Sequence, residues 1–186
     1  MPLPKRISLF AALVLTTVVV AACGGSSGPS GVSPSAYVKS VCTAVGPFEK
    51  DVVSRSSALN LTTIKNAAQG KTALQGFLSA VAADTTSALA KLKAAGVPSV
   101  KNGKSIANAI VGAFGQLDGT MSVAVKQAGS IPTNSPSAFK NAAQSLGATV
   151  RTSMAKIGTN LQSSTLKSPA LEQAAAKESA CKTLGG

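Results

Sequence analysis

Residues 74–128 read LQGFLSAVAADTTSALAKLKAAGVPSVKNGKSIANAIVGAFGQLDGTMSVAVKQA, two apolar stripes of helical spacing separated by a glycine–proline break. The stripes run through Leu74, Leu78, Val81, Leu89 and Leu92 before the break, and through Ile106, Ile110, Phe114, Leu117, Met121 and Val125 after it. Spacing of three or four residues places side chains on one face of an α-helix. Gly96-Val97-Pro98 should end the first helix. The sequence therefore predicts two long helices, the second over about 103–128.

Further helices are predicted on both sides of this pair. Ser35 is the expected N-cap of a first helix, in which Gly46-Pro47 should make a kink or break because an internal proline removes an amide donor. Thr62 or Thr63 is the expected N-cap of the helix before the break. The expected buried residues are Val38, Val41, Cys42, Val45, Phe48 and Val52 in the first helix, and Ile64 and Ala68 at the start of the next.

The C-terminal third of the chain continues the helical pattern. A fourth helix is predicted over about 137–162, with a buried stripe at Phe139, Leu146, Val150, Met154, Ile157 and Leu161. A short last helix opens at Ser168-Pro169, since proline is well tolerated at the first helical position. Gly112, Gly115 and Gly119 suggest closely packed backbones. The predicted fold is all-α, an antiparallel four-helix bundle with a short C-terminal helix.

Residues 1–23 have the parts of a bacterial lipoprotein signal. Lys5 and Arg6 precede an apolar run over 7–20, which is short for a membrane-spanning helix. Val20-Ala21-Ala22-Cys23 then resembles a lipobox, in which the cysteine thiol accepts diacylglycerol. We expect residues 1–22 to be removed, Cys23 to be lipidated, and residues 23–34 to form a flexible Gly/Ser/Pro tether to a domain over 35–186. A plain signal peptide and an uncleaved anchor are the alternatives.

Cys42 and Cys181 are the two cysteines of the predicted domain. An exported protein matures in an oxidising compartment, where such a pair usually forms a disulfide. That bond would tie the last helix, in which we place Cys181, back to the first helix. Two free buried thiols are one alternative, and half of a metal site is another. The metal alternative is weak because the chain contains no histidine.

The positive charge suggests an anionic partner. Without Lys5 and Arg6, sixteen cations face six acids, which gives a net charge of +10. Nucleic acid is a poor candidate because the chain is exported, has few arginines and offers no aromatic platform. Anionic lipid headgroups or cell-wall polymers fit better, although lysines spread over all the helices also serve as solubilising groups.

Candidate catalytic motifs are weak in this chain. Ser-x-x-Lys matches begin at Ser137, Ser153 and Ser164, but their companion motifs are missing. Asp84 and Asp118 could meet as a carboxylate pair serving a glycosidase or a cation, although solvated or lysine-paired acids are the simpler interpretation. Without histidine, acid–base catalysis near neutral pH needs a strongly shifted carboxylate or lysine. We expect no catalytic residues, no metal and no cofactor.

The chain also resembles small helical lipoproteins and secreted proteins of actinobacteria. The resembling residues are the Val20-Ala21-Ala22-Cys23 lipobox, Tyr37-Val38 with Cys42, the segment from Ala95 to Gly103, and Ala180-Cys181. The resemblance implies an extracytoplasmic location and a helical fold, and it implies no activity. The expected function is a membrane-anchored, non-enzymatic binding or envelope-interaction module. The alternative is a carrier that holds an apolar ligand, such as a lipid, between its helices.

Overall fold

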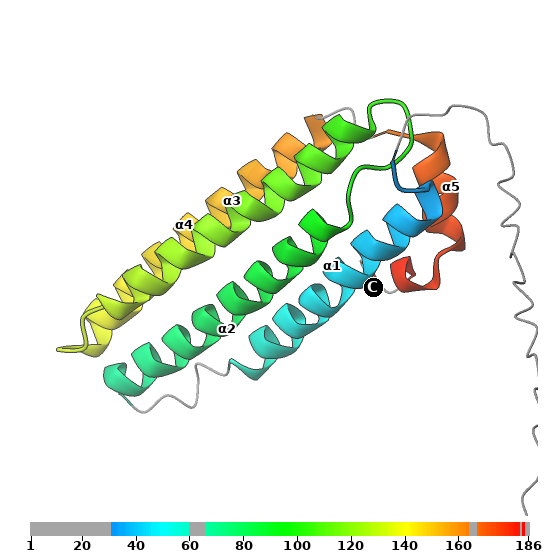
Figure 1. Cartoon of the computed structure of the whole chain (residues 1–186). Coiled ribbons are helices and arrows are strands. Elements are labelled where there is room, and N and C mark those ends of the chain that lie inside the picture. Colours follow the sequence, from blue (N-terminus) through cyan, green and yellow to red (C-terminus); the bar gives the residue numbers. More distant parts are fainter. Residues whose placement is uncertain (1–30, 60–65, 164–166, 183, 185–186) are drawn as a thin grey trace, which may run out of the picture.

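The structure, a computed structural model, describes residues 31–59, 66–163, 167–182 and 184. Within these ranges it is all-helical and has no strand, which confirms the predicted fold class. Figure 1 shows the long helices lying side by side, with a short C-terminal segment packed beside the first of them. The elements are α1 (Pro34–Ala58), α2 (Ala67–Ala94), α3 (Gly103–Gly129), α4 (Pro136–Ser163), α5 (Pro169–Lys177) and the 3₁₀ helix η2 (Ser179–Cys181).

Two predicted N-caps are wrong. The side chain of Ser33, and not that of Ser35, accepts a hydrogen bond from the amide of Ala36 at 3.3 Å, and α1 begins at Pro34. Proline suits the first helical position because its missing donor would have no partner there. At α2, the Asn66 side chain accepts a hydrogen bond from the amide of Gln69 at 2.9 Å, so the helix begins later than the predicted Thr62 or Thr63 caps require.

Helix α1 runs through Pro47, so the predicted break there is wrong, the other predicted outcome being a kink. An internal proline costs a helix about 3 kcal/mol, so other contacts have to hold the segment together. Ala44 is buried on one side of the proline, and on the other side the Phe48 ring meets that of Phe114 edge to face, with the centroids 5.6 Å apart. Packing against α3 thus offsets the tendency of Pro47 to interrupt the helix.

The other helix boundaries agree with the sequence to within a few residues. Gly96 follows the end of α2 with a φ of +76°, the left-handed conformation that favours glycine after a helix. Pro169 stands at the start of α5, with Ser168 before it. Cys181 does not lie in that last helix as predicted. Helix α5 ends at Lys177, and Cys181 belongs to the separate turn η2.

The core lies between the long helices, which pack in chain order. Helix α2 contacts both α1 and α3, and α3 also contacts α4. A central hydrophobic cluster takes side chains from all four, being formed by Val81, Leu117 and Met121 with Phe48, Val52, Phe77, Ala82, Val150 and Ile157. The sequence misplaced two residues in this core, because Met154 is 47% exposed and Ala68 is also exposed. Ile64 lies outside the described residues.

Candidate functional site

The Cys42–Cys181 disulfide is formed as the sequence predicts. The two Cα atoms lie 5.1 Å apart, within the range that a disulfide spans. Cys42 is buried on α1 and packs with Val38 and Ala174 in a small hydrophobic cluster at the α1–α5 contact. The bond therefore joins η2 to α1 and holds α5 against it. Cys23, the predicted lipidation site, lies outside the described residues, and its modification stays a prediction.

Two backbone hydrogen bonds fix the point where the chain joins the helical domain. The amide of Val32 donates to the carbonyl of Val97 at 2.8 Å, and the amide of Ser99 donates to the carbonyl of Val32 at 2.8 Å. These bonds clip the residues just before α1 onto the loop between α2 and α3. Residues 31–33, which the sequence assigns to the tether, are thus attached to the domain. The sequence does not predict this contact, because backbone hydrogen bonds leave no pattern of residue types or charges.

Tyr37, Ala95 and Ala107 form a buried cluster beside this clip. The three residues come from α1, from the end of α2 and from α3, and Leu171 of α5 packs against them. This cluster holds together four elements that are far apart in the chain. Tyr37 is only 3% exposed although the predicted apolar stripe of α1 does not include it.

A small apolar hollow of about 260 Å³ lies where α1, α3 and α5 meet. Aliphatic side chains and Tyr37 make most of its wall, and Glu172 stands at its edge. The lining residues are Tyr37, Val38, Val41, Cys42, Ile106, Ile110, Leu171, Glu172 and Ala175. Binding sites for small ligands usually measure about 300–1,000 Å³. This hollow is therefore slightly smaller than a typical site, and its walls suit an apolar group.

Burial raises the pKa of Tyr37 above its ordinary value of 10.0, because the interior disfavours the phenolate. The folded state then holds the phenolic proton more tightly than the unfolded chain does. Below pH 10 both states are protonated and Tyr37 adds no pH dependence. Above pH 10 the unfolded state loses the proton first, so the free energy of unfolding falls as the pH rises.

We expect Tyr37→Phe to weaken this alkaline loss of stability. Phenylalanine has nearly the same shape and no proton to lose. Chemical denaturation of both proteins at pH 8, 10 and 11 would measure the effect, and the difference between the two proteins isolates the contribution of Tyr37. If the free energy of unfolding fell by the same amount in both proteins between pH 8 and 11, Tyr37 would not contribute to the alkaline loss of stability.

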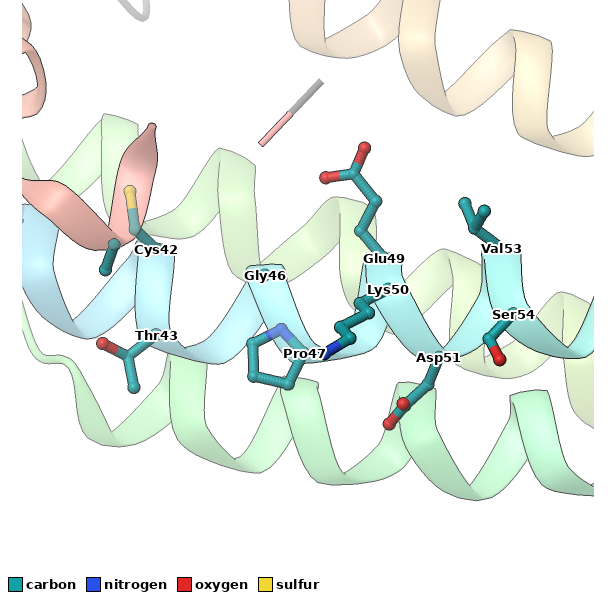
Figure 2. Close-up of a pocket in the computed structure, with 10 residues that line it drawn as sticks. Cys42, Thr43, Gly46, Pro47, Glu49, Lys50, Asp51, Val53 and Ser54 are labelled. Atoms are coloured by element: carbon teal, nitrogen blue, oxygen red, sulfur yellow. The ribbon is translucent and has the colours of Figure 1, made fainter. Parts of the chain in front are cut away.

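A wider groove of about 800 Å³ runs along α1 next to the disulfide. Its lining includes Pro47, Glu49, Lys50 and Asp51 of α1 and Ala180 of η2. Figure 2 shows Glu49 and Asp51 pointing to opposite sides of the helix. Catalysis by two carboxylates requires that both face one substrate. Glu49 and Asp51 do not meet this requirement.

The acids considered as a catalytic pair have separate partners. Asp84 on α2 accepts a hydrogen bond from the guanidinium of Arg55 on α1 at 3.2 Å, and Asp118 on α3 accepts one from the hydroxyl of Thr86. Arg55 is about half exposed, so its ion pair contributes at most about 1 kcal/mol. These contacts join neighbouring helices, which is a structural role.

The remaining sequence candidates also lie on helices. Ser137 and Ser153 are on α4, and Ser164 lies outside the described residues. In the described ranges no three metal-ligating side chains come together. None of the helices in those ranges combines the length and hydropathy needed to cross a bilayer. No protein-family model, curated protein or solved structure matches this chain.

Proposed function

We propose that this chain is a lipoprotein held by a lipid on Cys23 at the extracytoplasmic face of the cell membrane. There its helical domain acts as a non-enzymatic binding or envelope-interaction module. The observation that carries the proposal is the sequence Val20-Ala21-Ala22-Cys23, which follows a charged start and an apolar run. A cysteine directly after two alanines at this point has the position that lipid attachment requires.

The disulfide supports the export step of this proposal. Disulfides persist in oxidising compartments and are rare where thiols are kept reduced. The bond between Cys42 and Cys181 closes a loop with a sequence separation of 139 and has a geometry that the fold accommodates. A domain built around such a bond suits a protein that folds outside the cytoplasm.

The chemistry of the domain supports a non-enzymatic role. The chain has no histidine, and the carboxylates described above either diverge or pair with a neighbouring helix. We further propose that the four long helices form an antiparallel bundle. Its support is the central cluster, to which α1, α2, α3 and α4 all contribute side chains.

A carrier of an apolar ligand is the second candidate. The hollow between α1, α3 and α5 favours it, because its walls are apolar and a short acyl chain has a suitable shape. Its volume is at the lower limit for a ligand site, so we place this candidate second. Native mass spectrometry of the purified domain distinguishes the two candidates, since a carrier retains an apolar ligand.

Replacing Cys23 with alanine tests the anchor. We expect Cys23→Ala to stop lipidation, so that the protein leaves the membrane fraction for the medium or accumulates as an unprocessed precursor. Fractionation, immunoblotting and metabolic labelling with a fatty acid would measure both effects. The double variant Cys42→Ala/Cys181→Ala is the control, because it removes the other two cysteines of the chain together, leaves no free thiol from the disulfide and should keep the label. A Cys23→Ala protein that fractionates and labels like the wild type contradicts the proposal.

A further inference from the structure

Six lysines gather at the end of the domain where residues 31–33 join it. We call this the proximal end, and it consists of the start of α1, the end of α2, the start of α3, the end of α4 and the start of α5 (Figure 1). Each of the six side chains is exposed. These proximal lysines are Lys39, Lys91, Lys93, Lys101, Lys104 and Lys167.

The tertiary structure brings these lysines together from four elements. Lys91 and Lys93 lie in the last turn of α2, Lys101 lies in the loop that leads into α3, and Lys104 lies in the first turn of α3. Lys39 lies near the start of α1, which the clip at Val32 binds to that same loop. Lys167 comes just before α5, whose Leu171 packs onto the cluster of Tyr37, Ala95 and Ala107. Figure 1 shows α5 beside the start of α1 and close to the α2–α3 loop.

The charge at the proximal end is strongly one-sided. Two described acids lie near it: Glu172, in the first turn of α5, and Glu178, just before η2, whose Cys181 is bonded to Cys42. At the opposite end the described cations are Lys71, Lys126 and Lys140, together with Arg55, which is paired with Asp84. The proximal end therefore has the larger excess of positive charge.

Helix stability does not account for most of these lysines. A lysine near a helix C-terminus is favourable because the helix dipole is negative there, and this explains Lys91 and Lys93. Near a helix N-terminus the dipole is positive and disfavours a cation. Lys101, Lys104 and Lys167 nevertheless stand at or just before helix N-termini. The helix dipole therefore does not explain the positions of these three lysines.

The length of chain before the domain limits the distance between this end and a membrane. Seven residues lie between Cys23 and Gly31, so the Cα atoms of these two residues are at most about 28 Å apart when the chain is fully extended. The long helices are about 40 Å long at 1.5 Å per residue, so the opposite end lies much further from Cys23. A lipid on Cys23 would keep the proximal end next to the lipid surface.

We propose that the proximal lysines dock the domain onto anionic lipid headgroups of the membrane that holds the anchor. This proposal rests on the proposed lipid anchor for its orientation. Screening limits such attraction to about 10 Å at ordinary ionic strength, so the lysines at the membrane-side end contribute most. The docked domain stands with the proximal end on the membrane and the opposite end directed outward.

Vesicle binding by two charge-matched variants tests the proposal. The protein is the chain from residue 23 with Cys23→Ala, so that no lipid contributes, and the probe is vesicles of phosphatidylglycerol and phosphatidylcholine. One variant carries Lys101→Gln and Lys104→Gln, and the control carries Lys126→Gln and Lys140→Gln. All four lysines are exposed, and both variants lose two charges. Thermal melts establish that both fold.

We expect the proximal variant to lose at least tenfold in partition coefficient at low salt and the control to lose less than threefold. Each lysine near an anionic surface changes the partition coefficient by about fivefold. Equal losses in the two variants overturn the proposal, and so does a parent protein that does not bind the anionic vesicles. Binding to a soluble glycerol-phosphate polymer in preference to vesicles also overturns it and assigns the surface to a wall polymer. These outcomes are independent of the fractionation of Cys23→Ala in cells.

Discussion

Replacing Cys42 and Cys181 together with alanine should lower the free energy of unfolding by about 2–5 kcal/mol. The disulfide closes a loop with a sequence separation of 139, and a cross-link of this size strongly restricts the unfolded chain. Alanine leaves no unpaired polar group in the cluster around Cys42. Urea denaturation of the oxidised wild type and of the double variant gives the difference.

The same substitution should release α5 before the rest of the domain unfolds. Helix α5 spans only Pro169–Lys177, and a helix this short is not stable alone in water. Without the bond, apolar packing through side chains such as Leu171 and Ala174 is left to hold α5 against α1. Hydrogen exchange should then show fast amides in α5 and protected amides in α2 and α3. Uniform exchange, or an unchanged urea midpoint, would mean that packing alone holds α5.

Gly103→Ala should destabilise the domain by about 3 kcal/mol, the upper part of the range for overpacking a rigid site. A Cβ at Gly103 would overlap the carbonyl oxygen of Pro98 and lie 3.1 Å from its carbonyl carbon. The clashing atoms belong to the backbone of Pro98, and a backbone cannot avoid the clash by changing rotamer as a side chain can. The loop cannot easily retreat, because Val97 and Ser99 are bonded to Val32.

Gly112→Ala is the matched control, and its effect should have the opposite sign. Gly112 lies inside the same helix, and a Cβ there meets nothing within 4 Å. Alanine at an exposed helical position stabilises a protein by about 0.5–1 kcal/mol relative to glycine. Urea midpoints of the two variants should therefore move in opposite directions. A neutral Gly103→Ala would show that the Pro98 loop shifts at little cost.

These two glycines illustrate where sequence interpretation of this chain fails. The sequence singles out Gly112, Gly115 and Gly119 as points of close backbone approach, but a Cβ at any of the three meets nothing within 4 Å. The close approach occurs at Gly103. Helical periodicity identifies which residues share a face, yet it does not identify which backbone a partner segment will contact.

The sequence by itself determines the local features of the domain. Leu78, Ile106 and Leu117 repeat at helical spacing and are buried as expected, and the helices end close to the predicted glycine and proline breaks. The Cys42–Cys181 bond is also predictable, since the sequence predicts export and an oxidising compartment favours pairing of the two cysteines in the domain. Helix propensity and periodicity depend on residues a few positions apart, so the chain specifies them locally.

Only the tertiary structure decides what depends on distant segments. Packing of Phe48 on Phe114 keeps α1 continuous through Pro47, and the clip from Val32 to the α2–α3 loop sets where the chain leaves the domain. The lysines look evenly spread in the sequence, but six of them come to one end. These lysines come from four separate elements, and their charges reinforce one another only because the elements lie close together. That proximity depends on packing between distant segments, which local sequence patterns do not predict.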